Sequence, residues 1–441
     1  MVSSLTTPEN IRELQRKLYT KAKREPKYRF YLLYDKVYRR DILEHSYRLV
    51  KSNGGSPGVD GQDFEDIERA GLELWLTKIE EELKQKTYKP QAVRRVKIPK
   101  PGGGERPLGI PTIKDRVAQT ATKLVIEPIY EADLEDSAHG YRPGKSAVGA
   151  VKEVHEALCQ GYTDVVDADL SKYFDTIPHR ELLQTVAKRI VDKHLLHLIK
   201  MWLKVPVEEQ DEQGRPRMSG GRKSKTGTPQ GGVISPLLAN IYINRMLRAW
   251  RERGLDQKFQ GKIVAYADDF VVLSRGKAQE AMQWIAWAVN NLGLALNEGK
   301  TTIRDATQEK FEFLGYSFGP TRHRKDGHWY LGAQPSKTSQ ARLKAKLREV
   351  LHPGNVAPLE EVVTRVNRTL RGWSNYFCHG TRTIAYRAID HFVYERVRGF
   401  LCRRHKVSGR GTRRFSDSVV FEEYGFLRLR AVQLGPRAWA S

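Results

Sequence analysis

The sequence predicts an α+β fold in which small antiparallel sheets and amphipathic helices occupy separate stretches of the chain. Apolar runs joined by short turns rich in Gly, Pro or Asp are typical of hairpins. Longer stretches repeat apolar residues at helical spacing, with charged residues between them. The chain has 441 residues, roughly three domain-sized units of about 150 residues, which is enough for a large core without disulfides or structural metals.

The charge of the chain indicates a polyanionic partner. Lysine and arginine number 76 and aspartate and glutamate 52, a net charge of +24 at pH 7, which favours nucleic acid. Cys159, Cys378 and Cys402 form no CxxC pair, which argues against a zinc finger and a secreted disulfide framework. No apolar run approaches 18 residues and no signal peptide is visible, so we expect a cytoplasmic protein that makes no membrane contact.

The N-terminal elements are helices interrupted by one hairpin. Residues 8–50 carry a helical pattern, which Gly and Pro break at 52–61. A second amphipathic helix is predicted over 72–83, a hairpin over 93–111 and a helix over 115–134.

In the middle of the chain the strands begin to carry carboxylates. TDVVDADL at 163–170 is predicted to be a buried strand, and the basic stretch 179–204 a helix. The stretch 227–247 is a glycine-rich loop that runs into a helix. Ser235 is its expected N-cap, with Pro236 at the first helical position.

The remaining elements continue the same alternation. Residues 206–226 are polar and predict a mobile loop or a hairpin, and KIVAYADDFVVLS at 262–274 predicts strand–turn–strand. A helix, two strands and a helix with a basic face follow, at 276–294, 300–305, 309–319 and 336–351. The last forty residues are basic and loop-rich.

Two groups of carboxylates stand where a folded protein normally avoids them. Asp167 and Asp169 share one face of the strand at 163–170, because side chains alternate along a strand. Asp268 and Asp269 lie between two apolar strand segments. Each group alone has an ordinary explanation, a charged sheet edge or a polar turn. Together they predict a site where a cation offsets their repulsion.

The chemistry of these ligands favours magnesium. Carboxylate oxygens without neighbouring Cys or His suit Mg²⁺, which is held by carboxylates and substrate phosphates. Two such ions roughly 3.5–4 Å apart would activate a 3′-hydroxyl and stabilise a leaving pyrophosphate. A strand carboxylate joined to a hairpin-tip pair about 100 residues later is the layout of a polymerase palm.

The ordered motifs of the chain resemble those of the bacterial group II intron-encoded reverse transcriptases, also called intron maturases. The matching blocks cover about residues 50–320, and RTLRGWSNYFCHG at 369–381 resembles the maturase thumb region. They are NGGSPGVDG, RRVKIPKPGGGERPLGIPT, HGYRPGKSA, VVDADLSKYFDTIPH, GTPQGGVISPLLANIYIN, YADDF, LGLALNEGKT and FEFLGYSF. The chain ends without paired cysteines, so we expect the type that lacks the C-terminal endonuclease, and we expect no RNase H region.

The resemblance implies a right-hand polymerase with fingers, an antiparallel-sheet palm with helices on one side and a helical thumb. We expect an N-terminal helical extension and, at the other end, a basic C-terminal tail that is a candidate DNA- or RNA-binding segment. The expected boundaries of extension, fingers, palm, thumb or maturase (X) domain, and tail are 1–50, 51–150, 151–320, 321–405 and 406–441.

The resemblance also implies which residues act. The metal ligands are Asp169, Asp268 and Asp269, with Asp167 the competing choice in the first motif. Asp169 is preferred because the family places an aromatic residue five positions after the ligand, and Phe174 stands there whereas Asp167 has Lys172. Phe174 would then be a steric gate that excludes a ribose 2′-hydroxyl and selects dNTPs.

Further contacts follow from the same resemblance. Contacts to the nucleotide are expected from the fingers cations Lys100 and Arg106, from Gln230 and Gly231 and from Lys300, a candidate general acid; Arg116 is a weaker candidate. Template and primer contacts are expected from Tyr141, Arg142, Phe313, Leu314 and Gly315. Long duplexes are expected to bind a thumb helix bearing Arg342, Lys344, Lys346 and Arg348, and the tail segment 403–414 is a candidate contact to intron RNA or target DNA.

The function that the resemblance implies is RNA-directed DNA polymerisation with two Mg²⁺ ions, for which Mn²⁺ can substitute. The partners would be an RNA template, group II intron RNA, a DNA primer or target, and dNTPs, and the protein would also assist intron splicing and mobility. Three alternatives stay open: a splicing maturase without polymerase activity, a reverse transcriptase of a defence or CRISPR-associated system, and an RNA-dependent RNA polymerase.

Overall fold

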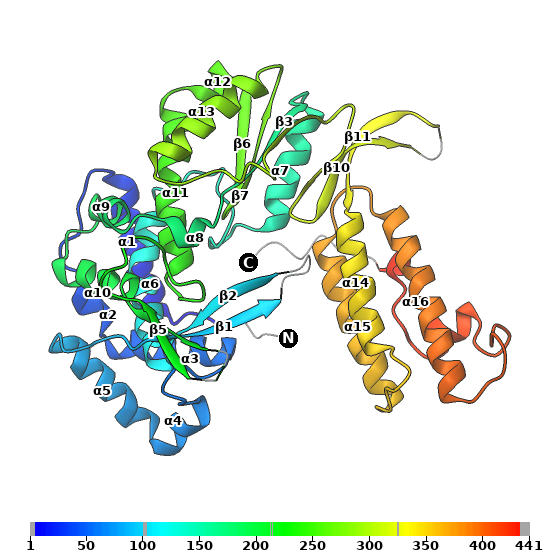
Figure 1. Cartoon of the computed structure of the whole chain (residues 1–441), viewed down its shortest axis with the longest axis horizontal. Helices are drawn as coiled ribbons and strands as arrows, with labels where there is room; N and C mark the ends of the chain where they lie inside the picture. Colours follow the sequence, from blue (N-terminus) through cyan, green and yellow to red (C-terminus); the bar gives the residue numbers. More distant parts are fainter. Residues whose placement is uncertain (1–4, 100–103, 212, 214, 324–325, 433–441) are drawn as a thin grey trace.

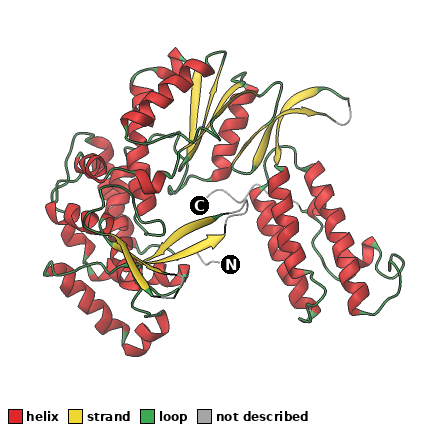
Figure 2. Cartoon of the chain, in the orientation of Figure 1, coloured by secondary structure: helices red, strands yellow, loops and turns green. Residues whose placement is uncertain are grey.

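The computed structural model describes residues 5–99, 104–211, 213, 215–323 and 326–432. Figure 1 shows the N-terminal helices on one side, the sheet that contains β3, β6 and β7 at the top, and the long helices α14, α15 and α16 on the other side. Figure 2 shows that the strands form separate small sheets among helices. The predicted α+β class is confirmed.

The N-terminal part is built around one buried helix, α6. Helices α1 and α3 pack against α6, which is buried on nearly every side, and the hydroxyl of Thr112, the residue before α6, caps its N-terminus. The predicted helix over 8–50 is broken between α1 and α2, where Phe30 instead pairs with Ile190. The helices are α1 (Glu9–Arg24), α2 (Tyr34–Val37), α3 (Arg40–Asn53), α4 (Phe64–Ala70), α5 (Leu72–Lys84) and α6 (Ile113–Glu131).

The predicted hairpin at 93–111 forms half of an outer sheet. Strands β1 and β2 pair antiparallel, and β1 pairs in parallel with β4. Of the two structures predicted for residues 206–226, a hairpin is present: β4 pairs with β5. The hairpin is part of the outer sheet because β4 also pairs with β1. The strands are β1 (Val93–Pro99), β2 (Glu105–Ile110), β4 (Pro206–Gln210) and β5 (Pro216–Gly220).

The stretch predicted as one helix at 179–204 is two helices. Asp192 separates them, because its carboxylate accepts from the amides of His194 and Leu195 and so begins the second. Sequence reasoning also missed the helix that precedes the first carboxylate strand. The helices of this region are α7 (Ala147–Cys159), α8 (Tyr173–Thr176), α9 (His179–Ala187) and α10 (Lys193–Leu203).

The central sheet has the order β6-β7-β3-β8, with all neighbours antiparallel. Successive side chains along its strands point to opposite faces of the sheet. Val166 and Phe270 join the core that contains α11 and α13, whereas Val165 and Val271 join the core that contains α7. The expectation of helices on one side only was wrong, since apolar residues on both faces need cover. The elements are β3 (Asp164–Asp169), β6 (Gly261–Tyr266), β7 (Asp269–Ser274), β8 (Thr302–Asp305), α11 (Ser235–Glu252), α12 (Leu255–Lys258) and α13 (Ala278–Asn291).

Helix α11 begins one residue away from the prediction. Ile234 occupies the N-cap position and Ser235 is the first helical residue, so the expected Ser235 cap was wrong. The Ser235 hydroxyl donates instead to the Pro229 carbonyl at 2.9 Å, which fastens the glycine-rich loop to the start of the helix.

A third sheet connects the central sheet to the C-terminal helices. Its order is β11-β10-β9, and the sequence did not predict β11. The C-terminal residues up to 432 are not a free tail: Phe415, Phe421 and Phe426 lie in the core of the helices. The elements are β9 (Phe311–Phe313), β10 (Tyr316–Arg322), β11 (Trp329–Pro335), α14 (Lys337–Val350), α15 (Leu359–Tyr376), α16 (Thr383–Arg404), a π-helix (Val419–Glu423) and a 3-10 turn (Leu429–Ala431).

Candidate active site

The register of the central sheet brings the two carboxylate motifs together. Asp169, the last residue of β3, is the cross-strand partner of Asp269, the first residue of β7. Directly opposed side chains in an antiparallel pair have Cβ atoms about 4.5–5.5 Å apart. Asp268 lies in the β6–β7 turn, and its carbonyl accepts from the amide of Leu170 at 3.4 Å. Residues almost a hundred positions apart thus share one edge of the sheet.

Mutual repulsion and partial burial make these carboxylates hard to ionise together. Loss of solvent in the cleft, and then the charges of Asp268 and Asp169, raise the pKa of Asp269 to about 6. Burial, and then Asp169, also raises the pKa of Asp268. Burial raises the pKa of Asp167 to about 6, although Arg304 opposes the rise.

Asp169 has partners of its own. Its Oδ2 accepts from Lys300 Nζ at 2.9 Å and from Asn297 Nδ2 at 3.0 Å. The Asp169 carbonyl accepts from the Asn297 amide at 2.8 Å. This ion pair raises the pKa of Lys300. The loop after α13 therefore supplies the positive charge nearest to the first carboxylate.

The donor set fits hard divalent cations. Asp169, Asp268 and Asp269 offer only oxygen ligands, and burial, followed by repulsion between the carboxylates, raises the pKa of Asp268 and Asp269, which a bound cation would offset. Among the described residues the three carboxylates do not form a group with oxygens all within 4.8 Å of one another. The three carboxylates would therefore have to approach one another to share an ion, and one oxygen of Asp169 is held by Lys300 and Asn297.

A cavity of about 450 Å³ lies beside the carboxylates. It collects residues from the outer sheet, the strand–helix turn after β3 and the glycine-rich loop before α11. Of the predicted site residues its lining includes Arg106, Tyr141, Asp169, Phe174, Gln230, Gly231, Asp268 and Lys300. Lys100 lies outside the described residues. Six motifs of the chain, distant in sequence, therefore enclose one space.

Phe174 and Gln230 stand on neighbouring parts of the wall. The Phe174 ring is half-buried and meets the ring of Tyr141 edge-on, with centroids 6.5 Å apart. The Gln230 amide Nε2 lies 3.1 Å from both carboxylate oxygens of Asp175, the residue after Phe174. The contact fixes the direction of the Gln230 amide.

Gly231 lets two loops approach closely. Its φ is +107°, a conformation that side-chain-bearing residues rarely adopt. A Cβ at this position would overlap the carbonyl oxygen of Gly109, and the Gly109 amide donates to the Gln230 carbonyl at 2.5 Å. The glycine-rich loop is thereby held against β2.

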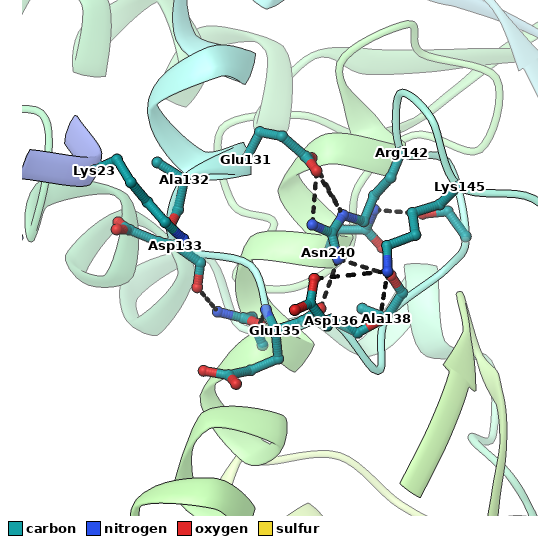
Figure 3. Close-up of polar contacts among 12 residues, drawn as sticks. Lys23, Glu131, Ala132, Asp133, Glu135, Asp136, Ala138, Arg142, Lys145 and Asn240 are labelled. Atoms are coloured by element: carbon teal, nitrogen blue, oxygen red, sulfur yellow. Dashed lines mark hydrogen bonds and ion pairs between the residues drawn. The ribbon is translucent and has the colours of Figure 1, made fainter. Parts of the chain in front are cut away.

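Tyr141 and Arg142 have different surroundings although they are adjacent. Tyr141 is half exposed in the cavity wall. Arg142 is buried, and Figure 3 shows its guanidinium facing Glu131, with a 2.6 Å ion pair. Its other nitrogen donates to the carbonyls of Glu135 and Ala138 at 2.6 and 2.7 Å. The donors of Arg142 are therefore used within the protein and hold the loop that presents Tyr141.

Arg116 is also engaged internally. The side chain is buried and donates to the carbonyls of Pro111, Gly54 and Ser56. It ties the loop after α3 to the start of α6 and does not line the cavity.

The predicted primer-contact residues form a strained turn against the C-terminal helices. Phe313 is buried at the end of β9, and Leu314 and Gly315 have φ of +50° and +77°. The Leu314 carbonyl accepts from Tyr376 Oη at 2.8 Å, and the Gly315 carbonyl accepts from the Ser339 hydroxyl at 2.9 Å. Helices α14 and α15 therefore fix this turn.

The basic residues of α14 divide into two sets. Arg342 and Lys346 are exposed, whereas Lys344 and Arg348 lie over the ring of Phe392 on α16. The tail segment 403–414 runs from the end of α16 into the loop that carries Phe415 into the core.

Two residues of the site were missed by sequence reasoning. Asn297 contacts Asp169, and Asp175 contacts Gln230. Neither residue belongs to a group of carboxylates or cations that stands out in the sequence. Their places within the motifs LNEGK and SKYFD were the available signal.

Comparisons with known proteins identify two family regions in the chain. The family described as reverse transcriptase (RNA-dependent DNA polymerase) matches residues 98–318, and the group II intron, maturase-specific domain matches residues 340–416. Protein YkfC of Escherichia coli K12 is 35% identical over 343 residues, which cover 69% of this chain and 87% of that protein.

More distant relatives cover a larger share of the chain. Group II intron-encoded protein LtrA of Lactococcus lactis is 28% identical, over 83% of this chain and 73% of LtrA. The putative COX1/OXI3 intron 1 protein of Saccharomyces cerevisiae is 26% identical, over 84% of this chain and 48% of that protein. Within the described part of the chain no helix has the length and apolar character needed to cross a bilayer.

Proposed function

The chain belongs to the reverse transcriptase family and carries the maturase-specific domain of group II intron proteins, and from this premise we propose how its cleft copies RNA into DNA. It is an RNA-directed DNA polymerase that acts in the splicing and mobility of a group II intron. The observation that carries the proposed mechanism is the cross-strand pairing of Asp169 with Asp269 beside Asp268.

Asp169, Asp268 and Asp269 are the proposed ligands of the divalent ions that this family uses, with Mg²⁺ the expected ion and Mn²⁺ a substitute. When bound, such ions polarise a 3′-hydroxyl and offset the charge of a triphosphate. Lys300 leaves Asp169 and moves to the phosphates of the nucleotide. There it gives a proton to the departing pyrophosphate.

The incoming dNTP is proposed to occupy the 450 Å³ cavity. Arg106, on β2, faces the phosphates from the outer sheet, since a guanidinium binds phosphate oxygens in a bidentate way. Phe174 excludes a 2′-hydroxyl. Asp175 acts as a positioning residue, because it orients the amide of Gln230 toward the nucleotide.

The template and primer are proposed to meet the cavity from opposite sides. Tyr141 offers an exposed ring for a template base, and Arg142 holds its loop without touching the strand. The turn of Phe313, Leu314 and Gly315 supports the primer end, because the C-terminal helices fix its backbone. The exposed cations of α14 follow the duplex backbone.

Extension of a DNA primer on an RNA template tests the proposal. With Mg²⁺ and dNTPs we expect the full chain to extend the primer, and Asp268→Ala to abolish extension while intron RNA is still bound by the dispersed cations. Asp256→Asn, a change at an exposed carboxylate on α12, is the matched control and should leave extension intact.

The alternatives predict other results of the same assay. Purified chain that promotes intron splicing but never extends the primer would leave only the maturase without polymerase activity. Equal use of NTPs and dNTPs would identify an RNA polymerase.

A further inference from the structure

Among the described residues, a group of side chains outside the polymerase cleft has the composition of a metal site. His323, Asp326 and His328 lie at the end of the β10–β11 hairpin, and one ligand atom from each falls within 4.8 Å of the others. Within the described residues this is the one such group of three His, Cys, Asp or Glu side chains. None of the three residues belongs to a motif used above.

The hairpin register explains why the two histidines converge. Arg322 pairs with Trp329, so His323 and His328 are the next opposed pair, and the His323 amide donates to the His328 carbonyl at 2.8 Å. Opposed residues point to the same face of a ladder. Their rings stack with centroids 4.8 Å apart. The preceding residue on that strand, Arg322, lies on the other face by alternation.

Asp326 completes the set from the turn. Its Oδ1 lies 2.6 Å from Nδ1 of His323 and 2.6 Å from Nδ1 of His328. The two imidazole nitrogens and the carboxylate oxygen therefore face a common point. All three side chains are accessible to solvent, so an ion can enter without opening the fold.

We propose that His323, Asp326 and His328 bind a zinc-class divalent ion at the tip of this hairpin. Two imidazoles and one carboxylate select Zn²⁺, Co²⁺ or Ni²⁺ over Mg²⁺, whose ligands are oxygens. Three protein ligands leave a coordination position for water. This site differs from the aspartate cleft in its ligand atoms, because it offers imidazole nitrogens as well as carboxylate oxygen.

The position of the site couples it to the C-terminal helices. Tyr330 follows His328 on the same face, and its ring lies 5.9 Å from the ring of His328. Its hydroxyl lies 2.7 Å from Oγ1 of Thr381, in the loop between α15 and α16. The Thr381 amide donates to the carbonyl of Ala333 on β11 at 2.7 Å. A bound ion would therefore make the β10–β11 hairpin more rigid, and this hairpin contacts the loop between α15 and α16.

Metal binding to the full chain tests the proposal directly. The probes are Zn²⁺ by calorimetry and Co²⁺ by visible absorption, both with excess Mg²⁺ to occupy the aspartate cleft. We expect one tight equivalent in the wild type. His328→Ala and Asp326→Asn should each weaken binding of that equivalent by at least about 10–100-fold, since even outer-shell changes have effects of that size.

The control is His352→Ala, at an exposed histidine after α14, which should bind as the wild type does. Thermal melting without metal checks that each variant folds. Wild-type affinity and stoichiometry in His323→Ala, His328→Ala and Asp326→Asn would overturn the proposal. So would a Co²⁺ spectrum with thiolate charge-transfer bands, because the ion would then sit at cysteine. The test measures metal binding alone, so its result does not depend on whether the protein is active as a polymerase.

Discussion

Phe174 is the residue proposed to select the sugar of the incoming nucleotide. Its ring lines the cavity beside Asp268 and is held edge-on against Tyr141. Phe174→Ala opens room for a 2′-hydroxyl and should lower the preference for dNTPs over NTPs by at least about tenfold. The ratio of kcat/KM for the two substrates is the measurement, and it is insensitive to a fraction of misfolded enzyme. An unchanged ratio would remove Phe174 from the gate.

Asp269 gives the metal-free protein a characteristic pH dependence. Its native pKa of about 6 is above the ordinary value of an aspartate, so the native state holds this proton more tightly than the unfolded state does. The stability that this proton contributes is complete below the ordinary aspartate pKa of about 3.9 and is lost as pH rises from there through about 6.

Asp269→Asn removes this loss of stability. In chelator, the melting temperature of the variant should exceed that of the wild type at about pH 7.5 and match it only below about pH 4, where the aspartate of the unfolded chain is protonated as well. Asp256→Asn, outside the cleft, should follow the wild type at both values. Adding Mg²⁺ above pH 6 should raise the melting temperature of the wild type more than that of Asp269→Asn, because the ion offsets the repulsion that the variant lacks.

At the scale of elements, the turn of Leu314 and Gly315 depends on helices that follow it in the chain. Tyr376→Phe removes the hydrogen bond to the Leu314 carbonyl, a loss of about 0.5–1.5 kcal/mol. We expect a severalfold increase in KM for the primer–template and unchanged binding of RNA alone. Tyr394→Phe removes a similar bond, to the carbonyl of Phe415, and serves as the control. Equal effects of the two changes would mean that only general stability was lost.

The elements differ in how well the sequence predicts them. Hairpins with alternating apolar residues, such as 93–111 and 262–274, are confirmed because their pattern is local. The parallel contact of β1 with β4 was missed because it joins strands more than a hundred residues apart. The break in 179–204 was missed because it depends on Asp192, whose capping role competes with a continuous apolar pattern.

The candidate site shows the same division. The aspartates and Phe174 were predicted because motif order fixes their roles by resemblance, and these roles stay predictions that the geometry supports. The internal partners of Arg142 and Arg116 could not be predicted. The sequence does not distinguish an arginine whose donors face solvent from one whose donors bind backbone carbonyls. Burial distinguishes the two cases, and burial depends on the tertiary fold.

At the scale of the whole molecule, the charge of +24 predicts how duplex binding responds to salt. Neutralising six to ten phosphates should make affinity fall by about 10³–10⁵ between about 50 and 200 mM salt. Lys346→Ala should reduce the slope of log affinity against log salt by about 1, since this side chain is exposed on α14. Lys78→Ala, on α5, is the control. An identical slope for both variants would exclude α14 from the duplex surface.

The most direct test of the central claim is the anomalous scattering of Mn²⁺ in crystals of the chain with primer, template and dNTP. We predict two peaks roughly 3.5–4 Å apart, bounded by the carboxylates of Asp169, Asp268 and Asp269, with Lys300 no longer bonded to Asp169. Peaks held by other residues, or an Asp169 that stays paired with Lys300 while the ions bind elsewhere, would contradict the proposed catalytic centre.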